Sequence, residues 1–323
     1  MQTPLLEVKD LCINISSSRG KYNLTDNLNF EVYPGETFGL VGESGCGKSI
    51  TALSIMRLIT YPLFIKSGEI LLDGQNLLKI TEKEMRQVRG KSISMIFQEP
   101  MTSLDPIFTV QDQLIEVLKI HRKMAQDQMM AKISSLLELV GIPRVKDVLA
   151  SYPHQLSGGM LQRVMIAMAM MLDPRLLIAD EPTTALDVTI QAQILALMND
   201  LKEHFDTSII IITHDLGVVA ETCRRVAVLY AGQIVELGEA EDIFHNPAHP
   251  YTQGLLKSMK TLGAKEKLYS IKGTVPSMED IGLGCRFLAR CDYVGSGCGQ
   301  KQLLKAVSTE SRHLCRCHRA HTS

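Results

Sequence analysis

The chain has 323 residues, with 34 Lys or Arg against 35 Asp or Glu, so its formal net charge is −1. This balance lacks the basic excess of nucleic-acid-binding proteins, and we expect no nucleic-acid partner. An apolar fraction of 45% argues against global disorder. No apolar run approaches the ~20 residues of a membrane helix, and the N-terminus does not resemble a secretory signal. We therefore exclude an integral membrane protein and a secreted mini-protein, and expect a soluble, cytoplasmic protein of about two domains.

The first strands along the chain are predicted to be antiparallel. Residues 5–15 and 28–33 alternate apolar and polar side chains with a period of two. Residues 34–36, Pro-Gly-Glu, predict a turn, and residues 37–42 predict a short buried strand. That strand leads through a glycine-rich loop into a helix predicted over residues 49–59.

The middle of the chain is predicted to be helical. Residues 111–142 carry apolar side chains at helical spacing, and the pattern ends at Gly141 and Pro143. Residues 159–172 predict another helix. We expect this block, about residues 100–172, to be a helical insertion into an α/β core.

Strand patterns return after the helical block. Residues 175–180 and 208–213 are continuous apolar runs, as expected for parallel strands that are covered on both faces. Residues 185–204 between them predict the crossover helix. Residues 225–232 and 234–238 predict strands that close a second sheet region.

The glycine-rich loop fits the phosphate-binding pattern G-x-x-x-x-G-K-[ST], with a strand predicted before it and a helix after it. Glycines let backbone N–H groups turn inward, and the helix N-terminus adds partial positive charge. Lys48 can reach the β- and γ-phosphates, and the Ser49 hydroxyl can ligate Mg²⁺. The whole loop consists of Gly42, Glu43, Ser44, Gly45, Cys46, Gly47, Lys48 and Ser49.

Two acids, Asp180 and Glu181, follow the predicted strand 175–180. Alone, such a pair is more often a solvated loop or a helix cap. Beside a phosphate loop, Asp180 is suited to the Mg²⁺ shell and Glu181 to polarising the attacking water as a general base. The presence of the loop favours the functional interpretation.

Residues 156–163, LSGGMLQR, resemble the signature of ABC-transporter ATPases, LSGGQ followed by QR, with Met160 in place of the usual Gln. Ser157, Gly158 and Gly159 start a predicted helix and form a second anion-binding surface. In the family this surface faces the nucleotide of a partner subunit, so that two chains sandwich two ATP molecules. The resemblance implies an α/β fold: a P-loop NTPase (RecA-like) core, an antiparallel β subdomain and a helical signature subdomain.

Further positions match the family in the expected order. Gln98 resembles the Q-loop glutamine, which senses Mg²⁺ and water and touches the membrane partner. The segment Ala185-Leu186-Asp187 resembles the D-loop that crosses the dimer. His214 resembles the switch histidine that contacts the γ-phosphate, and Tyr22 aligns with the aromatic residue that stacks on adenine. The implied groups are catalytic Glu181, His214 and Gln98; Mg²⁺ ligands Ser49, Gln98 and Asp180; and Ser157, Gly158, Gly159 and Asp187 across the interface.

Residues 249–256, HPYTQGLL, and 273–291 resemble the oligopeptide/dipeptide/nickel import ATPases, closest to the dipeptide-type subunits. A polar stretch at 260–267 predicts the boundary between domains 1–260 and 261–323. The resemblance implies an ATPase that powers di- and oligopeptide uptake, peripheral on the cytoplasmic face of the inner (plasma) membrane. Its implied partners are a second ABC ATPase, homologous or identical, two transmembrane permeases and, indirectly, a solute-binding protein. Nickel or another small solute, and a soluble non-transport ABC ATPase, are the alternatives.

Five of the eight cysteines crowd into the C-terminal extension, at Cys285, Cys291, Cys298, Cys315 and Cys317. In a cytosolic chain such a cluster suggests a metal before a disulfide. Some peptide-import ATPases carry a cluster on this extension. The resemblance therefore implies [4Fe–4S] on Cys285, Cys291, Cys298 and Cys315, with Cys317 as the alternative fourth ligand. Zinc, or metal-free cysteines, remain open.

Overall fold

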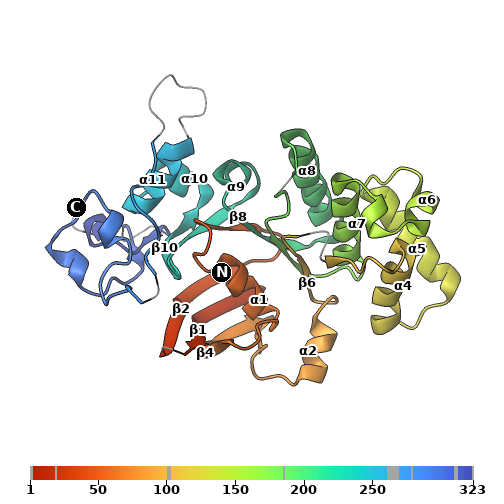
Figure 1. Cartoon of the computed structure of the whole chain (residues 1–323), viewed down its shortest axis with the longest axis horizontal. Coiled ribbons are helices and arrows are strands. Elements are labelled where there is room, and N and C mark those ends of the chain that lie inside the picture. The colour runs from red at the N-terminus through yellow and green to blue at the C-terminus, as the bar shows by residue number, and fades with distance from the viewer. Residues whose placement is uncertain are drawn as a thin grey trace. The chain divides into compact units, whose positions relative to one another are not determined.

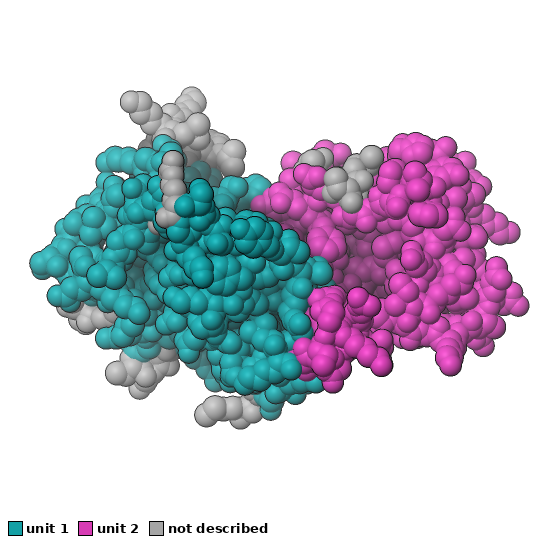
Figure 2. All heavy atoms as spheres, turned by 60° about the horizontal axis from the view of Figure 1, so that its bottom comes forward, with its two compact units in different colours: residues 1–33, 37–79, 212–323 teal, residues 34–36, 80–211 magenta. Residues whose placement is uncertain are grey.

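The computed structural model describes residues 3–18, 20–99, 103–184, 186–259, 269–277, 279–308 and 312–321 (Figure 1). The chain forms two compact units (Figure 2): unit 1 comprises residues 1–33, 37–79 and 212–323, and unit 2 comprises residues 34–36 and 80–211. Both units combine helices with strands, so the predicted α/β class is confirmed. Every helix in these ranges is too short or too polar to span a bilayer.

Unit 1 contains an antiparallel sheet built from the N-terminal strands. Its strands, in the order β2-β1-β4-β5, are β2 Gly20–Val32, β1 Leu6–Ser17, β4 Leu63–Leu72 and β5 Gln75–Asn76. The predicted pairing of the first two strands is confirmed, with Leu6 opposite Val32 and Ile15 opposite Tyr22. The apolar positions of the alternating pattern, such as Leu6, Leu11 and Ile13, are fully buried. The alternating apolar and polar side chains of the sequence therefore account for the buried face of this sheet.

Unit 1 also contains strands of a second sheet. In order they are β11 Lys305–Ala306, β12 Leu314–Cys315, β10 Gln233–Glu239, β9 Arg225–Tyr230 and β3 Thr37–Val41. β3 and β9 run parallel, and the other pairs are antiparallel. Phe30 of the first sheet stacks on Phe38 of β3, with ring centroids 5.4 Å apart. The two sheets of unit 1 thus share an apolar core.

The helices of unit 1 are α1 Lys48–Ile55, α9 Leu216–Thr222, α10 Ala240–His245 and α11 Pro250–Met259, with 3₁₀ turns at Leu288–Arg290, Ser296–Gly299 and His318–His321. The helix predicted to run to residue 59 ends earlier. Met56 is its C-cap, and Arg57 has φ 51°, a left-handed conformation that terminates a helix.

Unit 2 consists largely of helices. Its strands are β6 Ile93–Ile96 and β7 Leu176–Asp180, which run parallel, together with the first part of β8 Ser208–Thr213. Its helices are α2 Glu82–Val88, α4 Val110–His121, α5 Gln126–Leu139, α6 Val145–Ala150, α7 Gly158–Met170 and α8 Val188–Phe205, with a 3₁₀ turn at Pro153–Gln155. The predicted helical stretch 111–142 is two helices, because Arg122 leaves the helical conformation at φ −134°, ψ 137°. Gly141, at φ 73°, ends the second as expected.

The C-terminal extension is built into unit 1 through β12 and a buried carboxylate. Glu236 of β10 has no exposed surface, and it accepts hydrogen bonds from the N–H groups of Ala248 (2.6 Å) and His249 (3.0 Å). His313 Nε2 lies 2.6 Å from the same carboxylate. A buried carboxyl group requires such hydrogen-bond partners, so this cluster ties the last residues to the sheet. The predicted boundary at 260–267 lies outside the described residues, and the division at 260/261 stays a prediction.

Candidate nucleotide-binding site

The glycine-rich loop lies between β3 and α1, which is the strand–loop–helix context predicted for it. Gly42, Gly45 and Gly47 adopt φ values of 153°, 77° and 106°, where a side chain would be strained. A Cβ at Gly42 would also collide with the carbonyl oxygen of Leu229. The loop therefore needs glycine at this position, and its backbone is free to turn N–H groups toward a bound anion.

Lys48 is folded back onto this loop. Its side chain is buried, and its Nζ donates to the carbonyl oxygens of Gly42 (2.8 Å) and Glu43 (3.1 Å). The Cys46 thiol lies 4.0 Å from the same Nζ, and burial raises its pKa. The thiol thus stays neutral, and Lys48 supplies the positive charge of the loop. Ser49, the next residue of α1, is half-buried.

The rear of the loop is braced by residues from far along the chain. The N–H of Glu43 donates to the hydroxyl of Tyr251 (2.9 Å), and the Glu43 carboxylate pairs with Arg290 at 2.7 and 3.1 Å. Tyr251 packs against Tyr230 and Phe287, with centroids 4.6 and 5.5 Å apart. The roles of Tyr251 and Arg290 were not predicted from the sequence. They lie 208 and 247 positions from Glu43, and no local pattern signals such a contact.

In unit 2, the structure brings Gln98 and Glu181 together. Asp180 ends β7 and is buried, and Glu181 follows it at φ 47°, an uncommon conformation for a residue other than glycine. Gln98 Nε2 donates to Glu181 Oε2 (3.1 Å), and Thr184 Oγ1 donates to the same oxygen (2.8 Å). Strained backbone of this kind is concentrated at functional sites.

Two exposed helix caps in unit 2 correspond to the signature and the D-loop. Ser157 caps α7, and its Oγ accepts the N–H of Met160 (3.4 Å); Gly158 and Gly159 form the first turn. Asp187 caps α8 and accepts the N–H of Ile190 (3.0 Å). Ser157 and Asp187 are both exposed, so neither cap is closed off within its own unit. Ala185 lies outside the described residues.

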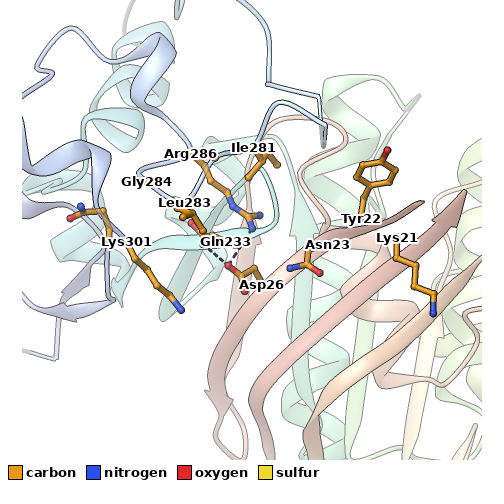
Figure 3. Close-up of a pocket in the computed structure, with 12 residues that line it drawn as sticks. Lys21, Tyr22, Asn23, Asp26, Gln233, Ile281, Leu283, Gly284, Arg286 and Lys301 are labelled. Carbon is orange, nitrogen blue, oxygen red and sulfur yellow. Dashed lines mark hydrogen bonds and ion pairs between the residues drawn. The ribbon is translucent and has the colours of Figure 1, made fainter. Parts of the chain in front are cut away.

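His214 and Tyr22 belong to unit 1. His214 is exposed and follows β8 directly. Tyr22 of β2 is half-buried and lines a cavity of about 490 Å³ (Figure 3). At this cavity, Asp26 accepts hydrogen bonds from Gln233 (2.9 Å) and from Arg286 of the extension (3.2 Å). The residues predicted for the nucleotide site thus divide between the units: the loop, Tyr22 and His214 lie in unit 1, and the others lie in unit 2.

The five clustered cysteines of the described extension are free of disulfides, and several backbone hydrogen bonds surround them. Cys285 N–H donates to the Cys298 carbonyl (2.8 Å), and the sulfurs of Cys291 and Cys298 accept the N–H groups of Tyr293 (3.3 Å) and Gly295 (3.4 Å). Burial and the neighbouring thiolates raise the pKa of Cys285 to about 11. Across the described ranges, however, no three Cys, His, Asp or Glu side chains form a group that could hold a metal ion. The expected cluster set is therefore not assembled in this structure.

Comparison with known proteins identifies the family. The ABC transporter profile matches residues 25–184, and the profile of the oligopeptide/dipeptide transporter C-terminal region matches residues 235–298. The oligopeptide transport ATP-binding protein OppD of Bacillus subtilis is 54% identical over 294 residues, covering 90% of this chain and 82% of OppD. The dipeptide transport ATP-binding protein DppD of the same organism is 50% identical over 289 residues, covering 89% of this chain and 86% of DppD.

A solved structure agrees with this assignment. The dimeric structure of MJ0796, a bacterial ABC transporter cassette, matches with a TM-score of 0.66 and 25% identity over 73% of this chain and 98% of that one. The chain therefore belongs to the ATP-binding proteins of ABC transporters, in the branch that carries the oligopeptide/dipeptide transporter C-terminal region.

Proposed function

We propose that this chain is the ATP-binding and hydrolysing subunit of an ABC importer that powers the uptake of di- and oligopeptides. One observation carries the proposal: this family member has both halves of an ATPase site. Its phosphate loop is formed around a buried Lys48, and its Glu181 carboxylate accepts a hydrogen bond from Gln98. The peptide cargo rests on the relatives, which are named for oligopeptide and dipeptide transport. Within an importer the chain's own chemistry is ATP hydrolysis.

Binding of the triphosphate begins at the loop. Its backbone N–H groups receive the phosphate oxygens, and the ammonium of Lys48 exchanges the carbonyl oxygens of Gly42 and Glu43 for the β- and γ-phosphates. Each hydrogen bond to a charged group contributes about 1.5–3 kcal/mol. Tyr22 would stack on the adenine.

The Mg²⁺ that accompanies ATP fits the donors present. Ser49, Gln98 and Asp180 offer a hydroxyl, an amide and a carboxylate oxygen, the hard ligands that Mg²⁺ prefers. Asp180 is a buried acid and is suited to a cation partner. When bound, Mg²⁺ would neutralise charge on the phosphates.

Hydrolysis requires a base for the attacking water, and Glu181 is the candidate. Gln98 and Thr184 both donate hydrogen bonds to its Oε2, which hold the carboxylate in one orientation. A base held in one orientation removes the proton with less reorganisation. His214 would contact the γ-phosphate.

A partner cassette completes the site. Ser157, Gly158 and Gly159 at the start of α7, and Asp187 at the start of α8, are proposed to act on the nucleotide held by the partner. The exposure of Ser157 and Asp187 supports this, since a cap that serves another subunit must be accessible. The partner is a second ABC ATPase, identical or homologous.

An apolar groove in unit 2 suits the membrane partners. It has a volume of about 280 Å³ and is lined by residues that include Phe97, Ile120, Met165 and Met168. Ile120 is 64% exposed, and Phe97 directly precedes Gln98. We assign this groove to a helix of a transmembrane permease, which would hold the chain on the cytoplasmic face of the membrane and link its movement to Gln98.

The test is ATP-dependent uptake by proteoliposomes that contain this chain, its partner cassette and the two permeases, with the solute-binding protein supplied outside. Labelled di- and tripeptides should accumulate and stimulate hydrolysis, and Lys48→Ala should abolish both. If nickel stimulates ATP hydrolysis and no peptide is taken up, the cargo is nickel and not a peptide. Failure to associate with the permeases, with full ATPase activity, would favour a soluble ABC ATPase.

We also propose a [4Fe–4S] cluster on Cys285, Cys291, Cys298 and Cys315, with Cys317 as the alternative fourth ligand. The N–H groups directed at the sulfurs of Cys291 and Cys298 support it, since such bonds stabilise cluster thiolates. Both candidates for the fourth ligand, Cys315 and Cys317, interact electrostatically with Cys285. A bound cluster would supply one-electron chemistry or a structural cross-link. Anaerobic purification with iron and sulfide assays tests it, and a colourless, iron-free, folded protein would contradict it.

A further inference from the structure

The phosphate loop contains a negative charge that is paired with the C-terminal extension. Glu43 is the second residue of the loop, and its two carboxylate oxygens meet the two terminal nitrogens of Arg290 at 2.7 and 3.1 Å. The Arg290 side chain is only 6% exposed and that of Glu43 is 26% exposed. Arg290 lies in a 3₁₀ turn of the extension, at Leu288–Arg290. The contact is therefore a shielded, two-pronged ion pair within unit 1.

The guanidinium of Arg290 is held in place on several sides. Its Nε donates to the carbonyl oxygen of Lys272 (2.8 Å), and Nη1 lies 3.5 Å from the hydroxyl of Tyr230. The guanidinium carbon, Cζ, lies 5.7 Å from the centroid of the Tyr230 ring. That ring packs edge-on against Phe287, with the ring centroids 5.1 Å apart. Burial alone would lower the pKa of Arg290, but its hydrogen bonds to Glu43 and Tyr230 raise it above the ordinary value. The extension thus presents a preformed cation to the loop.

Glu43 needs this cation for a specific reason. Its carbonyl oxygen accepts a hydrogen bond from Lys48, and its N–H is bound by Tyr251, so its backbone belongs to the loop that receives phosphate. Its carboxylate would repel a triphosphate bound by the same loop, because like charges in a partly buried site interact strongly. Arg290 neutralises the carboxylate and holds it at the rear of the loop.

We propose that Arg290 is a positioning residue for ATP, acting through Glu43, so that the C-terminal extension forms part of the nucleotide site. This rests on the proposed function, because it assumes that the loop binds ATP. Because Arg290 would act through Glu43 and not on the reacting atoms, its loss should raise KM for ATP and leave kcat little changed. We expect Arg290→Gln to weaken ATP binding by about tenfold or more, from an uncompensated charge beside the phosphates.

A double-mutant cycle on the full chain tests the proposal. The dissociation constant of ATP with Mg²⁺ is measured by calorimetry for the wild type, Arg290→Gln, Glu43→Gln and the double variant. The double variant should regain most of the affinity that Arg290→Gln loses, because no carboxylate is left to repel the phosphates. High salt should shrink the loss in Arg290→Gln.

The matched control is Lys272→Gln, which breaks an ion pair with Asp292 in the same extension. The Lys272 side chain is 82% exposed, and this pair does not touch the loop. ATP affinity should be unchanged in this variant. If Arg290→Gln does not fold, Arg290→Lys, which keeps the charge but loses the two-pronged contact, should weaken ATP binding by less than Lys48→Ala.

Three results would overturn the inference: wild-type affinity in Arg290→Gln, a double variant as weak as Arg290→Gln, or an equal loss in Lys272→Gln. The second of these would mean that the extension only supports the fold. Lys48→Ala is measured in parallel. If Lys48→Ala binds ATP as well as the wild type, the proposed function fails too. If only Lys48→Ala loses ATP affinity, the proposed function stands and only the role of Arg290 is refuted.

Discussion

His249 makes the interior behind the phosphate loop sensitive to pH. Its imidazole is 1% exposed, and its Nδ1 accepts the N–H of Tyr251 (3.1 Å). Its ring lies 5.9 Å from Phe287, in the same cluster as Tyr251. Burial lowers the pKa of His249 from 6.5 to about 4, although the nearby Glu236 carboxylate opposes the shift. The folded protein therefore keeps this imidazole neutral.

The sign of the effect on stability follows from the lowered pKa. Below about pH 6.5 the unfolded chain takes up a proton at His249 that the folded chain refuses until about pH 4, so the free energy of unfolding falls as the pH falls through this window. Between about pH 7 and pH 5, a shift of this size corresponds to a loss of about 2 kcal/mol from this one group.

Urea unfolding of the wild type and of His249→Asn at these two pH values isolates the contribution of His249 to the free energy of unfolding. Asparagine can still accept the N–H of Tyr251 but cannot titrate, so the wild type should lose about 2 kcal/mol more than the variant. His245→Asn, which replaces an exposed histidine at the end of α10, should keep the wild-type pH dependence. Equal pH dependence in the wild type and His249→Asn would refute the reasoning.

Three further predictions concern the nucleotide site. Lys48→Ala should lose ATP affinity, because it removes the charge bound to the loop carbonyls; unchanged binding in equilibrium dialysis would mean that the loop is misassigned. Glu181→Gln should bind ATP but hydrolyse it about 10²–10⁴-fold more slowly, and should trap a closed dimer; wild-type phosphate release would exclude Glu181 as the base. Tyr22→Ala should weaken ATP binding by about 1–3 kcal/mol while Tyr22→Phe retains it. Equal affinity in all three forms would show that adenine stacks elsewhere.

The parts of the site that could be predicted are those in which neighbouring residues act together. The phosphate loop is a strand, eight residues and a helix, and Ser157 caps the helix that follows it, so local spacing carries both predictions. The order of the motifs pointed to Gln98 and Glu181 separately. Their hydrogen bond depends on the pairing of β6 with β7, which no local pattern specifies.

The bracing of the loop could not be predicted for the same reason. Arg290 meets Glu43 across 247 positions, and His313 meets Glu236 across 77. Each pair joins the extension to the rest of unit 1, and isolated charges in a sequence do not reveal their partners. The end of α1 was also missed, because apolar spacing continues past Ile55 while Arg57 adopts a left-handed conformation.

The central claim is that an ATP site of this chain becomes competent only against a second cassette. The most direct test measures hydrolysis per chain as protein concentration is varied, with and without the partner cassette, in the wild type and in Ser157→Arg. We predict activity that rises with association and that Ser157→Arg abolishes while the variant still binds ATP. Undiminished hydrolysis by dilute, isolated protomers, unaffected by Ser157→Arg, would contradict the account.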